Sequence, residues 1–141
     1  MIVLSFDFGT KIIGVAVGET SFSTIKVLKH LKCIKNRPNW ISINELINYW
    51  KPNIIVVGLP VYKNKKKQNI NKKIKKFAEN LKEKFQLKIK LHNEYLTTVE
   101  AKNYLFNNGG FKALKKGKID SLSAALILES WYFSLKSIKK K

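Results

Sequence analysis

The chain contains only two aspartates, and the first of them, Asp7, lies in an unusual place for an acid. It interrupts an apolar run over residues 2–8 that is rich in strand-forming residues. Aspartate is disfavoured inside strands, and burial of an unpaired carboxylate is costly, so a carboxylate kept there needs a metal ion, a cation or hydrogen bonds. We therefore favour a functional role for Asp7. A salt bridge to Lys11, or a turn-capping role, is the structural alternative.

Two further acids are candidates for the same chemistry. Asp120 directly precedes a helical run, where aspartate is also a good N-cap residue, so function and capping are equally open at this point. Glu94 follows a predicted strand that ends at His92, at the edge where a parallel sheet collects its ligands. An ordinary exposed loop acid is the alternative for Glu94, and a hydrogen-bonded structural residue is the favoured interpretation of His92.

Carboxylates from the first strand, the last strand and a late helix can converge at one edge of a sheet. Such a cluster binds hard cations through oxygen, with Mg²⁺ or Mn²⁺ favoured. Two such ions flank a scissile phosphate, activate the attacking water and neutralise the leaving oxygen. A metal-dependent nuclease is the chemistry that such a cluster would support, with Asp7, Glu94 and Asp120 as the candidate catalytic and metal-binding residues.

The elements that must position these acids are strand-rich at first and alternate afterwards. Two apolar runs, residues 2–8 and 12–17, are separated by a glycine-containing link of hairpin length. A capping box at Ser42 and Glu45 predicts a helix to about residue 51. The remaining predicted elements are an extended segment within residues 22–34, a buried strand over 53–59, a basic loop over 61–67, an amphipathic helix over 68–85, a strand over 87–91, a helix over 97–106, a loop over 107–118 and a last helix from Asp120.

This order predicts an α/β fold. The first three strands form an antiparallel meander, and the later strands add in parallel by right-handed crossovers. One mixed five-stranded sheet with helices on its faces is the most economical arrangement. We expect one domain over residues 1–136, followed by a solvated basic tail over residues 137–141.

The charge of the chain points to a polyanionic partner. Lys plus Arg is 28 and Asp plus Glu is 9, which gives a formal net charge of +19. Nucleic acid is the partner that such a surplus predicts, although drift toward A·T-rich codons is an alternative source of lysine. All basic residues except Arg37 are lysines, which favours contacts to phosphate and shape over base readout. The lysines expected to contact nucleic acid are Lys11, Lys63, Lys65, Lys66, Lys67, Lys115, Lys116 and Lys118.

Composition also excludes several classes of protein. No apolar run approaches the roughly 20 residues that span a bilayer. The first residues lack a basic n-region, so no signal peptide is predicted, and we expect a cytoplasmic protein without a membrane partner. The single cysteine, Cys33, excludes an intramolecular disulfide and a cysteine-based zinc cluster.

Several motifs, met in order along nearly the whole chain, resemble those of the YqgF/RuvX-type family. This family comprises RNase H-like Holliday junction resolvases that are also described as pre-16S rRNA nucleases. The motifs are Phe-Asp-Phe-Gly-Thr-Lys-Ile-Ile-Gly-Val-Ala-Val at residues 6–17, Val-Val-Gly-Leu-Pro at 56–60, Leu-Thr-Thr-Val-Glu-Ala at 96–101, and Lys-Gly-Lys-Ile-Asp-Ser at 116–121 leading into Ala-Ala-Leu-Ile-Leu-Glu at 124–129.

The resemblance implies an RNase H-like fold and a metal-dependent cut in structured nucleic acid. The family's first-strand aspartate falls on Asp7 and its late-helix aspartate falls on Asp120, which favours function over capping there. Its Asp-Glu-Arg triplet is Asn93-Glu94-Tyr95 here, which keeps the central acid. Asn93 removes a negative charge beside the metals, and Tyr95 removes a cation that could hold phosphate or orient Glu94.

Two other functions compete with the nuclease. The Asp-Phe-Gly-Thr start also resembles the phosphate-binding strands of actin-like kinases, but those clamp nucleotide between two domains and no Walker A motif is present. The stronger alternative is a non-catalytic RNA-binding module of ribosome assembly. The family's role in rRNA processing favours RNA over DNA junctions, with ribosomal precursor particles as a further partner. We expect a monomer or a weak homodimer.

Overall fold

The computed structural model describes residues 1–60, 65–94 and 121–139. Five strands form one sheet in the order β3-β2-β1-β4-β5. β1 pairs antiparallel with β2 and β2 pairs antiparallel with β3, whereas β4 is parallel to both β1 and β5. The structure therefore confirms the predicted mixed sheet, with an antiparallel meander followed by parallel strands.

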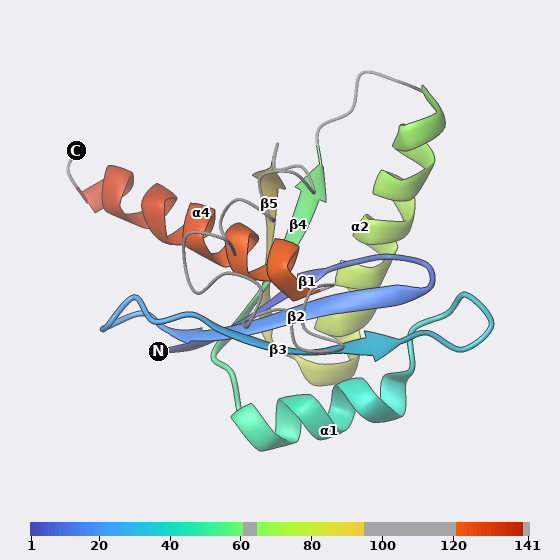
Figure 1. The fold of residues 1–141 in the computed structure, drawn as a ribbon, viewed down its shortest axis with the longest axis horizontal. Helices are drawn as coiled ribbons and strands as arrows, with labels where there is room; N and C mark the ends of the chain where they lie inside the picture. The colour runs from blue at the N-terminus through green and yellow to red at the C-terminus, as the bar shows by residue number, and fades with distance from the viewer. Residues whose placement is uncertain (61–64, 95–120, 140–141) are drawn as a thin grey trace, which may run out of the picture.

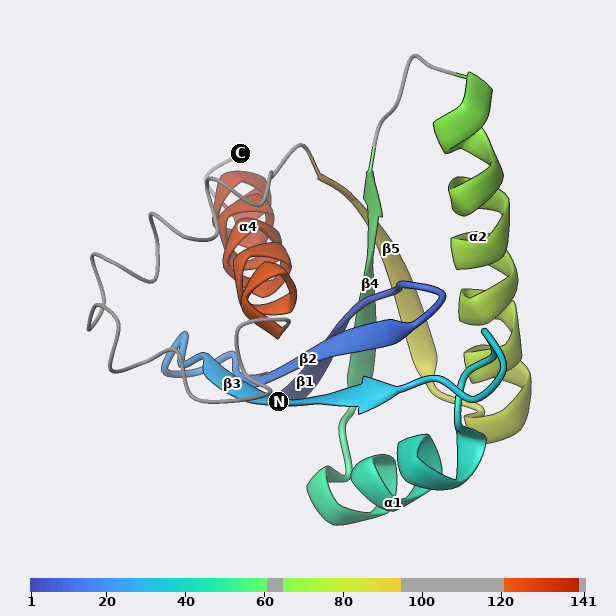
Figure 2. The same cartoon turned by 45° about the vertical axis from the view of Figure 1, so that its right-hand side comes forward.

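The helices cover the two faces of this sheet. Figures 1 and 2 show α4 on one face, with α2 and α1 on the other. The bounds of the elements are β1 Ile2–Asp7, β2 Ile12–Glu19, β3 Lys26–Lys32, α1 Trp40–Trp50, β4 Ile54–Pro60, α2 Lys65–Phe85, β5 Lys88–Glu94 and α4 Leu122–Lys139. No helix among the described residues is long and apolar enough to cross a membrane.

Successive side chains of β1 point to opposite faces of the sheet and contribute to two separate hydrophobic clusters. Leu4 and Phe6 are fully buried in the larger cluster, which the apolar sides of α1 and α2 complete. Val3 points to the other face and packs with residues of α4 such as Leu128. Because side chains of a strand alternate between faces, odd-numbered residues of β1 belong to the α4 face. Asp7 therefore lies on the α4 face.

The ends of three helices differ from the sequence-based expectations. Asn39, and not Ser42, is the N-cap of α1, and its side chain accepts a hydrogen bond from the Ser42 amide. α2 already begins at Lys65, so the predicted loop over 61–67 is helical in its last part. α4 continues to Lys139, into the segment expected to be a tail. The predicted helix over 97–106 and loop over 107–118 lie outside the described residues.

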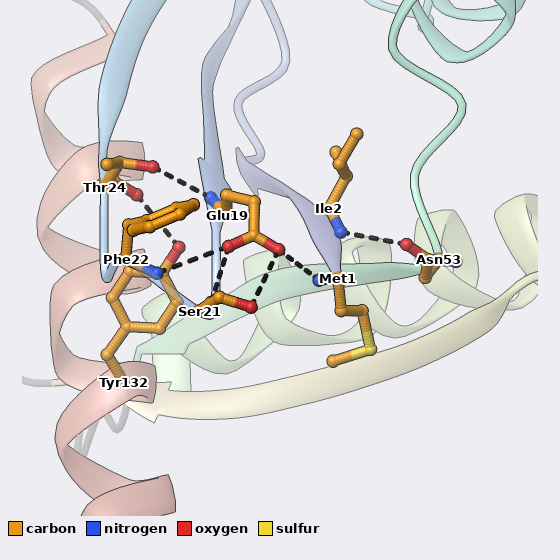
Figure 3. Close-up of polar contacts among 8 residues, drawn as sticks. All are labelled: Met1, Ile2, Glu19, Ser21, Phe22, Thr24, Asn53 and Tyr132. Atoms are coloured by element: carbon orange, nitrogen blue, oxygen red, sulfur yellow. Dashed lines mark hydrogen bonds and ion pairs between the residues drawn. The ribbon is translucent and has the colours of Figure 1, made fainter.

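A cluster of polar contacts links the start of β1, the end of β2 and α4 (Figure 3). The Glu19 carboxylate pairs with the amino group of Met1 and accepts the Ser21 amide at 2.6 Å, and the amino group is the main reason why the pKa of Glu19 is lowered. The Tyr132 hydroxyl of α4 donates to the Thr24 carbonyl at 2.9 Å. These contacts fasten α4 and the β2–β3 turn at the opposite end of β1 from Asp7.

Candidate active site at the carboxyl end of β1

Asp7 is the last residue of β1, and its partner in β2 is Gly14. The side chain is half-buried, and desolvation raises the pKa of this carboxyl from 3.8 to about 6. No hydrogen bond or ion pair joins Asp7 to another described residue, and Lys11 is exposed to solvent. The alternative of a salt bridge between Asp7 and Lys11 is therefore wrong. A carboxylate without a cation partner is kept here in spite of its desolvation cost.

The strand register brings β5 to the same edge and face. Phe6 is level with Val57, so Asp7 falls beside Gly58, and Gly58 is level with His92 of β5. His92 reaches the α4 face, because its Nε2 lies 2.8 Å from the Ser130 hydroxyl of α4. Position 94 is two residues further along the strand, and alternation assigns it to this face as well. The contact with Ser130 supports the structural interpretation of His92.

Asn93 is level with Leu59 of β4. Alternation assigns position 93 to the α1/α2 face, the opposite face from Asp7. The expectation that Asn93 removes a charge beside the metals is therefore not supported by the register. Tyr95 lies outside the described residues.

Hydrogen bonds and small residues bring the start of α4 over β1 and β2. The Ser121 hydroxyl accepts the Val15 amide at 3.0 Å, at a point where the β2–β3 register is irregular. The Ser5 hydroxyl donates to the Ala124 carbonyl at 2.8 Å. Gly58 leaves room for Ile127, because a Cβ on Gly58 would lie 2.3 Å from the Ile127 Cδ1 atom. Ser121, the residue after Asp120 in the chain, thus lies over the strand that pairs with Asp7.

The structure describes the predicted site residues to different extents. Asp7 is described with its side chain, Glu94 by its backbone in β5, and Asp120 lies outside the described residues. Within the described part of the chain, no group of three or more His, Cys, Asp or Glu residues could hold a metal ion. Lys11 is exposed, and Lys65, Lys66 and Lys67 form the first turn of α2. Lys63, Lys115, Lys116 and Lys118 lie outside the described residues.

Sequence reasoning missed Ser5 and Ser121, which are both fully buried and hydrogen-bonded across elements. A serine within the apolar run of β1 was a weak signal for Ser5. Ser121 carried no signal besides its place after Asp120, since serine at a helix start is common.

The profile of the RuvX family, described as Holliday junction resolvase, matches residues 1–134. This chain belongs to the RuvX family. A relative from Buchnera aphidicola subsp. Acyrthosiphon pisum (strain Tuc7), named "Putative pre-16S rRNA nuclease", is 52% identical over 132 residues, which are 94% of this chain and 98% of that protein. A protein of the same name from Glaesserella parasuis serovar 5 (strain SH0165) is 49% identical over 130 residues, or 92% of this chain and 94% of that protein.

A solved structure places this RuvX chain in its wider fold group. RuvC of T. thermophilus, in complex with a Holliday junction substrate, superposes with a TM-score of 0.62 over 96% of each chain, at 14% sequence identity. At this identity the likeness concerns the fold alone, and it confirms the predicted RNase H-like architecture.

Proposed function

We propose that this RuvX-family protein is a nuclease that hydrolyses phosphodiester bonds of pre-16S rRNA, at the 5′ end of the precursor, during ribosome biogenesis in the cytoplasm. The names of relatives that match nearly the whole chain support the activity and the RNA substrate. One structural observation carries the proposal: Asp7 is a desolvated carboxylate without a cation partner among the described residues. Position 94 and the start of α4 belong to the same face of the sheet.

The residues at this edge fit a divalent cation such as Mg²⁺ or Mn²⁺. Asp7 lacks a compensating positive charge within the described part of the chain, and burial holds its pKa at about 6. Asp7, Glu94 and Asp120 would hold the ions, because carboxylate oxygens are the ligands that hard cations prefer. When bound, such ions activate water as a nucleophile and stabilise charge on the leaving oxygen.

The chain itself contributes position and charge. Asp7 ends a strand that is paired with β2 on one side and β4 on the other, which fixes the backbone that carries its carboxylate. A carboxylate with a raised pKa must lose its proton before it binds a cation, so the acid form of Asp7 is inactive. The eight lysines named above are proposed to contact substrate phosphates, as point charges that position the backbone without reading sequence.

The test compares cleavage of precursor rRNA and of a four-way DNA junction, with and without Mg²⁺, by wild type and by Asp7→Asn. We expect Mg²⁺-dependent cleavage of the RNA and a loss of about a hundredfold or more in Asp7→Asn, because the variant removes a charge that holds the ion. Glu45→Gln is the matched control, since Glu45 is an exposed acid of α1.

Two outcomes would contradict the proposal. RNA binding without cleavage under every metal condition would leave the non-catalytic RNA-binding module as the function. Equal cleavage by wild type and Asp7→Asn would show that the carboxyl end of β1 is not the site.

A further inference from the structure

A pocket of about 480 Å³ lies on the α1/α2 face of the sheet, away from α4. It is formed by the turn after β3, the start of α1, the middle of α2 and the residue that follows Asp7. None of the nine described residues that line it is acidic. Six of them give the pocket its chemistry and define what we name the cation–aromatic pocket: Arg37, Lys73, Lys76, Phe8, Trp40 and Phe77.

The turn that carries Arg37 is tight, and its backbone is strained. Ile34 and Arg37 exchange two backbone hydrogen bonds of 2.9 and 3.0 Å. The two residues between them have positive φ angles, 51° at Lys35 and 62° at Asn36, which is the pattern of a type I′ turn. Neither is a glycine, so this backbone conformation is unfavourable, especially for lysine. The strained turn holds the only arginine of the chain at the pocket.

The aromatic side of the pocket is preorganised. Phe77 is buried, and its ring centroid lies 5.7 Å from that of Trp40, with the planes 30° apart, and 5.0 Å from that of Phe8. Phe8 and Trp40 are only half-buried, so each keeps surface for a further contact. The Lys84 ammonium lies 5.1 Å from the Trp40 ring centroid. Aromatic surface held in place in this way offers a stacking platform with little loss of side-chain freedom on binding.

We propose that the cation–aromatic pocket binds one nucleotide of a single-stranded nucleic acid. The base contacts Phe8 and Trp40, and the phosphate lies among Arg37, Lys73 and Lys76. Stacking on aromatic rings combined with a cationic groove is how proteins hold single strands without sequence preference. Arginine adds a bidentate contact that lysine cannot make.

The size and the place of the pocket agree with this ligand. Small-ligand pockets occupy about 300–1,000 Å³, a range that includes the volume observed here. Phe8 directly follows Asp7 in the chain, so the pocket begins one residue from the proposed catalytic carboxylate. The inference rests on the proposed function in one respect: a strand held in the pocket is the flank of the RNA that is cut at Asp7.

The test uses two pairs of lysines on the same helix. Lys73→Gln/Lys76→Gln removes the cations of α2 that line the pocket, and Lys72→Gln/Lys75→Gln removes two exposed lysines of α2 that do not line it. Binding of a fluorescent oligouridylate of about ten nucleotides is measured in chelator by anisotropy. We expect the dissociation constant to rise about tenfold in the first pair and less than about threefold in the second, with the salt slope falling by about 0.7 per lost phosphate contact in the first. Equal effects of the two pairs would overturn the proposal, because they would indicate a general attraction to polyanions.

A second measurement tests stacking. We expect oligouridylate to quench tryptophan fluorescence in wild type and this quenching to be lost in Trp40→Phe, which keeps an aromatic ring against Phe77 and leaves Trp50 and Trp131 in place. Polyglutamate of matched charge should bind more weakly and cause no quenching. Quenching that persists in Trp40→Phe, or competition by polyglutamate as strong as by oligouridylate, would overturn the proposal.

The two proposals can fail separately. Binding is measured without divalent cations, so it does not depend on cleavage. Loss of pocket specificity with intact cleavage would contradict the pocket alone, and intact pocket binding without cleavage would contradict the proposed function alone.

Discussion

The two faces of the sheet are stabilised in different ways. On the α1/α2 face, β1 contributes Leu4 and Phe6, which are fully buried and packed against other large apolar side chains. On the α4 face, Val3 and Val56 pack against apolar residues of α4 such as Leu128, and this packing is supplemented by the hydrogen bond of Ser5 to Ala124 and by the close approach of Ile127 to Gly58. Large apolar residues supply stability, whereas small and polar ones fix a helix at a defined position. The proposed catalytic carboxylate lies on the face where apolar packing is combined with hydrogen bonds between elements.

The largest effect that tests this contrast is expected at Phe6. Phe6→Ala leaves a cavity in the α1/α2 core, where the ring packs edge-on against Phe77 at 5.8 Å, and should lower the free energy of unfolding by about 3–5 kcal/mol. Chemical denaturation measures it. Phe22→Ala is the control, because Phe22 is 79% exposed, and it should change stability little. A similar loss in both variants would show that burial on this face is not what holds the fold.

A smaller effect is expected on the α4 face. Ser121→Ala leaves the Val15 amide without its partner and should lower the free energy of unfolding by about 1–3 kcal/mol. Ser134→Ala is the matched control, because the Ser134 hydroxyl bonds only to a carbonyl of its own helix, that of Trp131. Hydrogen exchange at Val15 should accelerate in Ser121→Ala alone. Unchanged exchange there would mean that the cross-element bond does not position α4.

The smallest effect is expected for a substitution of Asp7, and it is an increase in the free energy of unfolding where the two variants above show a decrease. Its pKa is 3.8 in the unfolded chain and about 6 in the folded one, so between these values the folded state holds more protons. Stability in chelator should therefore fall as pH rises from about 4 to 6 and stay lower above that range. Asp7→Asn should remove this pH dependence and be ~1–2 kcal/mol more stable than wild type at pH 7, after allowance for solvent around the side chain. Parallel denaturation curves at several pH values measure it, and a less stable variant at pH 7 would contradict the assigned desolvation.

The pattern of apolar residues was sufficient to predict the sheet. A short continuous apolar run such as that of β4 is typical of a strand that is buried on both faces. The first residues of the helices were harder to predict from the sequence. The Ser42 and Glu45 pair has the spacing of a capping box, yet both lie within α1 because the Asn39 side chain caps it first. The early start of α2 at Lys65 was missed because a lysine run carries no apolar period, although lysine is a good helix former.

Prediction of the site depended on a different kind of signal. Asp7 was chosen as a candidate because a lone acid in an apolar strand conflicts with its surroundings, a conflict that often marks function. The face to which it belongs follows from alternation, as does the assignment of Asn93 to the other face. The contact of Ser121 with Val15 joins residues 106 positions apart, and no local pattern encodes such a pairing. The cation–aromatic pocket was missed for the same reason, since three separate segments form it.

Asp7 and Phe8 are consecutive residues that serve opposite faces of one sheet. A polynucleotide in contact with both has to fold around the tip of the central strand within a very short path. Duplex DNA has a persistence length of about 50 nm and resists such a reversal. An RNA that carries a paired stem beside an unpaired end would make this bend at little cost, because the unpaired part is flexible. The geometry would therefore favour substrates that have a boundary between paired and unpaired nucleotides near the cut.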